Sequence, residues 1–463
     1  MSRLCEWTSS AFLKVMARLM TMATVVMTLA LTLTMTMTMM TGTAKAGIIR
    51  DTEIEDALLR IIRPMSESAG LNPDMMEVRV VINNQYNAFV MGDNMIYMHS
   101  GLITSADSML EVAGVLAHEI GHIAAGHIPR RGEVIENANM ASILSAVAAI
   151  ALSASGAGDA AFGVLAGGVD RSQRIVLARS RQDEGVADEI AIELMEEHEL
   201  SLKPMAEAMR KLGAQRVLPQ SRQSDYYLTH PGAQERSAVF QDHINNHETE
   251  PRDEPQWMKA LHQRITTKLL AWTNPPKTTL ANNFGDYSPA ATYQRAIALY
   301  RLSDVDSAEN EMRILLDEVP NDPYYHEFLG DVLMAKGEAA AAVDAYKTAI
   351  SLMETGLNKG QIFLSMGRAL MIKGDDASLN EAIVILEQAV QDEPEWAFVK
   401  HQLGIAYGKV GRLADADLIL AEEALLVGNT ELATRLAKRV STHDDASAIH
   451  KRLAADILLQ SGS

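Results

Sequence analysis

The dipeptides Leu329-Gly330, Met366-Gly367 and Leu403-Gly404 recur at intervals of 37 residues in the C-terminal part of the chain. A second glycine follows each dipeptide glycine seven positions later, at Gly337, Gly374 and Gly411. An alanine and then a larger apolar residue recur in the second half of each unit, as Ala342 and Tyr346, Ala382 and Leu386, and Ala416 and Leu420. Units of this length bury their apolar faces only against neighbouring units. This part of the chain must therefore fold as a stack of similar units.

These offsets match the tetratricopeptide repeat, whose ideal period is about 34 residues, once a short insertion is allowed around residues 375–378. Residues 289–322 fit a degraded first unit, and residues 429–460 fit a terminal helical pair. The pattern predicts an α-solenoid of about four repeats plus terminal helices over residues 289–460. Solenoids of this kind bind peptides or partner proteins on a concave face.

Residues 118–122 read His-Glu-Ile-Gly-His within an apolar stretch that begins at Met109. On a helix, His118 and His122 stand one turn apart on one face, so both imidazoles can bind one Zn²⁺ while Glu119 reaches a water. The apolar neighbours predict a buried helix, in which two histidines without partners would be costly. The motif therefore predicts one zinc ion per chain.

A catalytic zinc site needs a third protein ligand besides His118 and His122. His127 follows His122 by five residues and would be rotated about 140° from it on a continued helix, so we interpret it as a loop or cap residue. Glu184 and Asp188 are better placed, because they are four residues apart on a second helical pattern. One carboxylate can bind zinc while the other accepts a hydrogen bond from a ligand imidazole. Taken alone, such a pair is also typical of an ordinary acidic helix face.

Three motifs in order resemble the HtpX-like and CaaX-prenyl-protease-like family of zinc endopeptidases over roughly residues 50–245. They are the histidine motif, the segment Ser180-Arg181-x-x-Glu184-x-x-Ala187-Asp188, and Thr229-His230-Pro231 with Arg236. The resemblance implies a gluzincin-like fold. It also places His230 and Arg236, the histidine and arginine of the third motif, near the catalytic centre. It also suggests that this histidine can occupy the open zinc position. The implied roles are zinc ligands His118, His122 and Glu184, general base Glu119, orienting residue Asp188, and further catalytic residues His230 and Arg236.

Two strand-like runs, residues 78–82 and 94–98, flank the segment that begins Asn87-Ala88-Phe89, and a Gly92-Asp93 turn favours a hairpin. In the resembling family this region is an edge strand beside the zinc. An extended substrate could pair with such an edge through backbone hydrogen bonds, which makes Asn87, Ala88 and Phe89 candidate substrate-binding residues. An ordinary hairpin of the core is equally compatible with the pattern.

The first 46 residues have the pattern of a secretory signal peptide cleaved after Ala46. Basic residues come first, residues 19–44 are uncharged, and the segment ends in Ala44-Lys45-Ala46. The uncharged stretch is also long enough to span a bilayer, which leaves an anchor as the alternative. The only cysteine, Cys5, lies in this segment, so a cleaved chain would have neither a disulfide nor a cysteine nucleophile.

The net charge of the chain is −19, and it becomes −22 if residues 1–46, with four positive charges and one negative, are removed. Such an acidic chain is not expected to bind nucleic acid. The remaining 417 residues (463 − 46) exceed the usual size of a single core. We expect a metalloprotease domain over residues 47–245, a linker with an amphipathic helix over 246–288, and the repeat domain over 289–460.

An apolar, alanine-rich stretch over residues 137–169 is interrupted by Asp159. Three interpretations are open: a packed pair of core helices, a hairpin that inserts into a membrane, or an apolar lid over the site. Alanine-rich segments insert weakly into bilayers. We therefore rank a buried pair or lid first, and peripheral membrane contact second.

Together these patterns predict a mainly α fold, in which a gluzincin-like domain with a small β-sheet or hairpin precedes the solenoid. An exported zinc protease joined to such repeats resembles periplasmic bacterial proteases that degrade misassembled outer-membrane proteins. The resemblance implies stalled or unfolded outer-membrane proteins as clients and the barrel-assembly machinery as a partner of the repeats. Two alternatives are a membrane-associated relative that acts on lipidated or membrane proteins, and a chaperone or adaptor that works mainly through its repeats.

Overall fold

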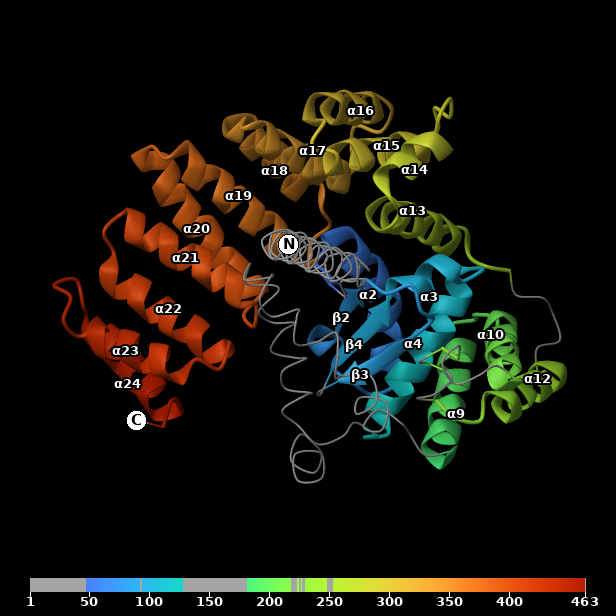
Figure 1. Cartoon of the computed structure of the whole chain (residues 1–463). Coiled ribbons are helices and arrows are strands. Elements are labelled where there is room, and N and C mark those ends of the chain that lie inside the picture. The colour runs from blue at the N-terminus through green and yellow to red at the C-terminus, as the bar shows by residue number, and fades with distance from the viewer. Residues whose placement is uncertain are drawn as a thin grey trace, which may run out of the picture. The chain divides into compact units, whose positions relative to one another are not determined.

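The computed structural model describes residues 47–91, 94–127, 181–217, 223–224, 226, 230–247 and 253–462 (Figure 1). Helices dominate and one small sheet accompanies them, so the predicted fold class is confirmed. The expected signal peptide, the apolar stretch 137–169 and Thr229 lie outside the described residues. Within the described part, the helices all fall short of the length and apolar character that a membrane span requires.

Among the described residues, the sheet has four strands in the order β1-β2-β4-β3. Strands β3 (Ala88–Met91) and β4 (Met95–His99) form the expected antiparallel hairpin, with Ala88 opposite Met98. Strand β2 (Glu77–Val81) runs parallel to β4, and the short β1 (Ile48–Ile49) runs antiparallel to β2. Strand β3 is therefore an edge strand of the sheet that the described residues form.

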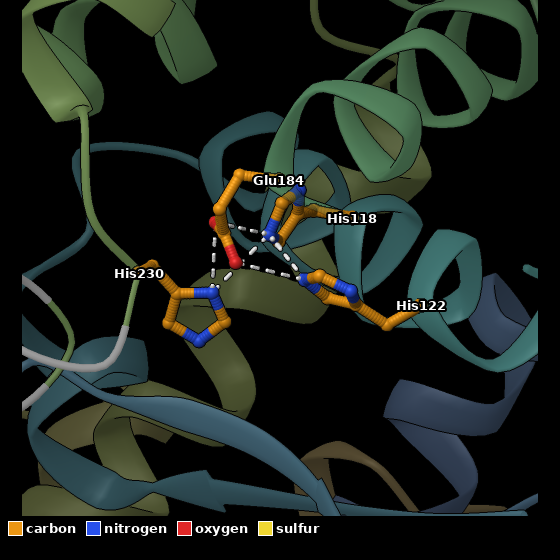
Figure 2. Close-up of side chains that lie close together, drawn as sticks. All are labelled: His118, His122, Glu184 and His230. Atoms are coloured by element: carbon orange, nitrogen blue, oxygen red, sulfur yellow. Dashed lines mark hydrogen bonds and ion pairs between the residues drawn. The ribbon is translucent and has the colours of Figure 1, made fainter. Parts of the chain in front are cut away.

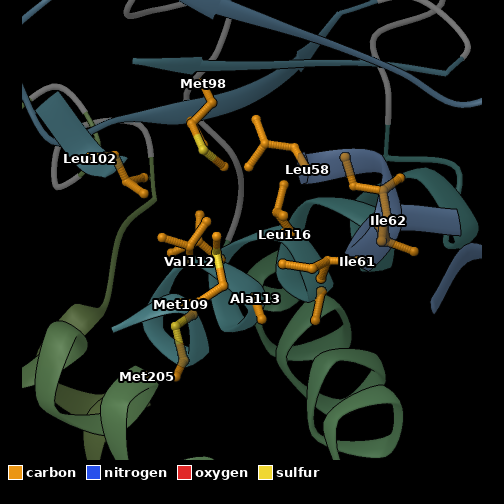
Figure 3. Close-up of a cluster of buried hydrophobic side chains, with 14 of the residues drawn as sticks. Leu58, Ile61, Ile62, Met98, Leu102, Met109, Val112, Ala113, Leu116 and Met205 are labelled. Atoms are coloured by element: carbon orange, nitrogen blue, oxygen red, sulfur yellow. The ribbon is translucent and has the colours of Figure 1, made fainter. Parts of the chain in front are cut away.

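Apolar side chains from the sheet and from several helices form the first hydrophobic core. Strand β4 contributes Met98, helix α2 (Thr52–Ser68) contributes Leu58 and Ile62, and helix α4 (Met109–Ala124) contributes Leu116, all fully buried (Figure 3). Helix α4 is buried along nearly its whole length, which explains why most of its residues are apolar. The other elements of this part are η1 (Pro73–Met75), α3 (Ser100–Ser105), α9 (Arg181–Glu197), α10 (Lys203–Gly213), η2 (Ala214–Val217) and α12 (Ala233–His247).

Helices α4 and α9 approach each other closely at Gly121. A Cβ atom added to Gly121 would lie 2.7 Å from the carbonyl oxygen of Ala187 and 3.1 Å from its Cα atom. Only glycine fits at so short a distance from another backbone. Because Ala187 lies one turn after Glu184, this contact sets the distance between the histidine motif and the predicted third ligand.

The C-terminal part consists of successive helix pairs, in the register that the repeats predict. In three pairs, the dipeptide glycine of the first helix faces a large side chain of the second: a Cβ atom at Gly330, Gly367 or Gly404 would lie 2.5–2.6 Å from Tyr346, Leu386 or Leu420. The glycine is therefore required for the two helices to pack. The helices are α15 (Pro289–Arg301), α16 (Val305–Glu318), α17 (Pro323–Lys336), α18 (Ala339–Leu352), α19 (Gly360–Lys373), α20 (Asp376–Asp392), α21 (Ala397–Lys409), α22 (Leu413–Leu426), α23 (Thr430–Val440) and α24 (Ala448–Gln460).

The insertion predicted near residues 375–378 takes the form of a longer helix. Helix α20 has 17 residues, whereas α18 and α22 have 14 each. Asp375 caps the additional turn, because its side chain accepts a hydrogen bond from the Ser378 backbone N–H at 3.0 Å. The inserted residues thus extend a helix and leave the glycine contacts of the unit unchanged.

The segment expected as a linker forms helices α13 (Gln256–Thr273) and α14 (Pro276–Asn282). Ile265 and Leu269 of α13 belong to the first hydrophobic core, whereas Ala271 belongs to the core of the repeats. The nearly buried Lys268 of α13 forms ion pairs with Asp51 at 2.7 Å and with Glu53 at 2.9 Å. Helix α13 is therefore packed into the molecule along much of its length.

Candidate metal centre

Helix α4 positions the two histidines of the motif. It begins after Ser108, whose side chain accepts a hydrogen bond from the Glu111 backbone N–H, a usual N-cap. His118 and His122 are both completely buried, and their Nε2 atoms lie 3.1 Å apart. The two Nε2 atoms therefore face one point, as the spacing of the motif predicts.

Glu184 of α9 and His230, which lies just before α12, complete a cluster of four buried side chains (Figure 2). The Glu184 carboxylate lies 3.4 Å from His118 Nε2 and 3.3 Å from His122 Nε2. His230 Nδ1 lies 3.1 Å from Glu184 Oε2 and 3.3 Å from His118 Nε2. All four ligand atoms lie within 4.8 Å of one another.

The cluster has the dimensions of a tetrahedral zinc site. Zinc binds histidine nitrogen and carboxylate oxygen at about 2.0–2.2 Å, so tetrahedral ligand atoms lie about 3.3 Å from one another. The five separations given above, which use Oε2 of Glu184 toward His118 and His230 and Oε1 toward His122, range from 3.1 to 3.4 Å. Three imidazoles and a carboxylate are also a donor set that suits zinc. The residues present therefore fit the ion that the sequence predicts.

Asp188 and Arg236 lie behind the cluster and contact its members. His118 Nδ1 lies 2.9 Å from Asp188 Oδ1, the contact that the spacing of Glu184 and Asp188 predicts. Arg236 donates from Nε and Nη2 to the two oxygens of Asp188, each at 2.7 Å, and from Nη1 to Glu184 Oε2 at 2.6 Å. The guanidinium thus compensates two carboxylates that would otherwise be buried without a cation.

These contacts control protonation of the cluster. Burial and the Arg236 charge oppose a proton on His118, but the hydrogen bonds that its ring donates to Asp188 and Glu184 prevail and raise its pKa to about 9. Burial acts to raise the pKa of Asp188, but the charge of Arg236 and the hydrogen bonds with His118 and Arg236 together outweigh it, so that pKa lies below its ordinary value. Since a metal requires neutral imidazole, metal binding near neutral pH must displace a proton from His118.

Glu119 is also completely buried, and neither of its carboxylate oxygens accepts a hydrogen bond from the described residues. The Nε2 atom of His230 lies 3.6 Å from Glu119 Oε1. A buried carboxylate in this position is costly unless water or a substrate supplies a donor. Its place next to the cluster is the one that a general base requires.

Tyr226 is a neighbour of His230 that the sequence patterns did not single out. Its ring stacks on the His230 imidazole, with ring centres 4.2 Å apart and planes inclined by 24°. The Tyr226 carbonyl oxygen accepts a hydrogen bond from the His230 N–H at 2.9 Å. The only sequence signal is an aromatic residue four positions before the histidine, a spacing too common to carry a prediction.

The candidate substrate-binding residues lie at the beginning of the edge strand β3, which contacts α4. Asn87 and Ala88 are buried, and Phe89 stacks on Tyr97 of β4 with ring centres 5.3 Å apart. The Asn87 carbonyl oxygen accepts a hydrogen bond from the His99 N–H at 2.9 Å. Asn87 Oδ1 is buried and accepts no hydrogen bond within the described part of the chain.

The profile of peptidase family M48 matches residues 49–243, a range that includes the cluster, Glu119 and Asp188. This part of the chain is therefore similar to that family of metallopeptidases, and the predicted metalloprotease class is confirmed.

The expected resemblance to beta-barrel assembly-enhancing proteases is confirmed among curated proteins. The protein of that name from Yersinia pestis is 25% identical over 275 residues, which cover 58% of this chain and 56% of the relative. The one from Escherichia coli strain K12 is 24% identical over 283 residues, which cover 59% and 56%. Metalloprotease LoiP of the same strain is 28% identical over 183 residues, which cover 38% and 66%. The chain thus spans little more than half the length of the first two relatives.

Proposed function

We propose that the protein is a zinc endopeptidase in which His118, His122 and Glu184 hold the metal. The observation that carries this proposal is the set of ligand separations close to 3.3 Å, next to a buried Glu119 carboxylate that accepts no hydrogen bond from the described residues. A purely structural zinc site would not require such a carboxylate beside it.

The protein groups divide the chemistry among them. A zinc ion supplies Lewis-acid chemistry, which polarises a carbonyl group and lowers the pKa of water. Glu119 accepts the proton of the attacking water and passes it to the leaving amine. Asp188 holds the His118 ring with its Nδ1 proton fixed, and Arg236 keeps both Asp188 and Glu184 ionised and oriented.

The substrate is proposed to be an extended, unfolded polypeptide. Strand β3 is the last strand of the sheet that the described residues form, and an edge of this kind can add a substrate strand through its backbone. Asn87, Ala88 and Phe89 lie at the beginning of this strand, and the side chain of Asn87 is buried there. Recognition through backbone hydrogen bonds selects unfolded chains over particular sequences.

We expect His230 to regulate the site. It occupies the fourth position of the cluster, whereas a catalytic zinc keeps one position open for water or substrate. His230 must therefore leave this position before cleavage, and His230→Ala should raise basal proteolysis or self-cleavage. If activity falls without unregulated cutting, His230 acts instead beside Arg236 in stabilising the transition state.

The clients, partner and compartment follow from the resemblance. We expect the protein to act in the periplasm on unfolded or stalled outer-membrane proteins, and to dock on the barrel-assembly machinery through its repeats. The names of the two relatives and the helix pairs of the C-terminal part support this assignment. For residues 137–169, which lie outside the described part of the chain, a buried pair or lid is the first expectation and peripheral membrane contact the second.

The decisive experiment compares Glu119→Gln with the matched control Glu189→Gln, which changes an exposed carboxylate of α9. Both variants should retain one zinc per chain by metal analysis. Glu119→Gln should cleave unfolded casein slower by several orders of magnitude, because the water loses its proton acceptor. A Glu119→Gln protein that digests casein as fast as the wild type would refute Glu119 as the general base. A wild-type protein that binds zinc without cleaving casein would favour an adaptor that acts through the repeats.

A further inference from the structure

The two histidines of the motif use different partners for their second ring nitrogen. His118 places Nδ1 2.9 Å from a carboxylate oxygen of Asp188. His122 places Nδ1 3.1 Å from Nδ1 of His127, a residue outside the four-residue cluster. Nearly every metal-binding histidine fixes its ring through the nitrogen that faces away from the metal. His127 stands where His122 would need that contact.

The end of helix α4 brings His127 to this place. Gly126 adopts the left-handed conformation, with φ +70°. The His127 N–H donates to the His122 carbonyl oxygen at 3.0 Å, which is the long hydrogen bond of a Schellman motif. The chain therefore turns back on the helix, and the His127 ring returns to the level of His122. On a continued helix the same residue would point elsewhere.

The contact fixes which nitrogens carry protons. If His122 binds the metal through Nε2, its neutral ring carries the proton on Nδ1 and donates it to His127. His127 must then accept at Nδ1 and carry its own proton on Nε2. That atom faces Asp183, whose Oδ1 lies 3.6 Å away. The side chains of His127 and Asp183 are 16% and 41% exposed, so solvent reaches only the outer end of this chain of contacts.

We propose that His127 is a positioning residue that sets the tautomer and ring orientation of His122 toward the metal, with Asp183 orienting His127 in turn. The proposal rests on the metal site described above and adds a group to it. Asp183 directly precedes the ligand Glu184 on α9. The contacts from His122 through His127 to Asp183 thus join the C-terminal end of α4 to the beginning of α9, the two elements that carry three of the metal ligands.

The test measures zinc affinity by competition with a chromophoric chelator, and cobalt substitution reports ligand geometry through the absorption spectrum. His127→Phe keeps a planar ring and removes the acceptor, and should weaken zinc binding by about 10- to 100-fold. His127→Asn restores an acceptor at the position of Nδ1 and should recover most of that loss, together with the wild-type cobalt spectrum. His247→Phe, at an exposed position on α12, is the control for loss of a histidine.

His118→Ala separates failure of this inference from failure of the metal site. If His118→Ala loses zinc while His127→Phe binds it as the wild type does, the positioning role is refuted and the metal site stands. If His118→Ala retains full zinc affinity, the metal site itself is refuted. Equal losses in His127→Phe and His127→Asn would also overturn the proposal, because an acceptor would then not be what matters.

If His127→Phe does not fold without metal, as judged by circular dichroism, the comparison uses His127→Asn and Asp183→Asn. Asp183→Asn should weaken zinc binding a few-fold and shift the cobalt spectrum, since the orientation of His127 is loosened. Wild-type affinity and spectrum in Asp183→Asn would remove Asp183 from the proposed chain of contacts.

Discussion

Replacing Gly121 by alanine should impair the metal centre without touching a ligand. The new Cβ atom would lie 2.7 Å from the Ala187 carbonyl oxygen, whereas ordinary contacts begin near 3.4 Å, so α4 and α9 must separate by roughly 0.7 Å. Metal–ligand distances tolerate deviations of only about 0.2 Å. Because Glu184 lies one turn before Ala187, its carboxylate moves with α9. We expect zinc affinity to fall by about 10- to 100-fold and the metal-free protein to lose about 1–3 kcal/mol of stability.

Gly185→Ala is the matched control, since an added Cβ there meets no described atom within 4 Å. It lies beside Glu184 on the same helix, and should stabilise the protein by about 0.5–1 kcal/mol through helix propensity. Zinc affinity is measured by chelator competition and stability by urea unfolding of the metal-free proteins. If Gly121→Ala binds zinc within two-fold of the wild type and unfolds at the same urea concentration, the close contact of α4 and α9 does not set the ligand geometry.

Three further changes test other parts of the structure. Asp188→Asn should keep the fold and weaken zinc retention by about 10- to 100-fold, and unchanged affinity and turnover would show that this carboxylate does not orient His118. Burial raises the pKa of Asp56 to about 7 from 3.8, although the Tyr324 hydroxyl donates to it. The folded state therefore holds this proton more tightly, and the resulting stability, up to about 4 kcal/mol, is complete below about pH 4 and lost as the pH rises through about 7. The free energy of unfolding, measured with urea, should therefore fall between about pH 5 and about pH 8 in the wild type but not in Asp56→Asn. An equal decline in the wild type and in Asp56→Asn would contradict this prediction. In the repeats, Gly330→Ala should lower the unfolding temperature, because its Cβ would lie 2.5 Å from the Tyr346 ring. Gly408→Ala is the control, since its Cβ would meet no described atom within 4 Å. Equal unfolding temperatures of the two variants would refute the packing role of Gly330.

The features that could be predicted from the sequence are those set by local periodicity. Helical spacing placed His118 and His122 on one face, and put Asp188 one turn from Glu184, so the contact between Asp188 and His118 followed once α4 and α9 were paired. The repeat register likewise identified Gly330 and Tyr346 before their contact was known.

Other features depend on contacts that periodicity does not encode. The left-handed conformation of Gly126 ends helix α4 and turns the chain back, so the His127 side chain points toward His122. On a continued helix it would point away from His122. The stacking of Tyr226 on His230 and the pairing of β1 with β2 join segments whose approach depends on the whole domain. The sequence predicts an amphipathic helix in the linker. That this helix, α13, packs against two cores cannot be predicted from its own sequence, because it depends on the surfaces of both cores.

The position of α13 has a consequence for how the molecule unfolds. Ile265 and Leu269 complete one core and Ala271 the other, on a helix held by the ion pairs of Lys268 with Asp51 and Glu53. Melting of either core would strip α13 of half its contacts and expose the buried lysine and its partners. Such sharing makes the energies of the two cores interdependent. We therefore expect calorimetry to record one cooperative transition over residues 47–462, with no intermediate in which the repeats have melted and the metal centre persists.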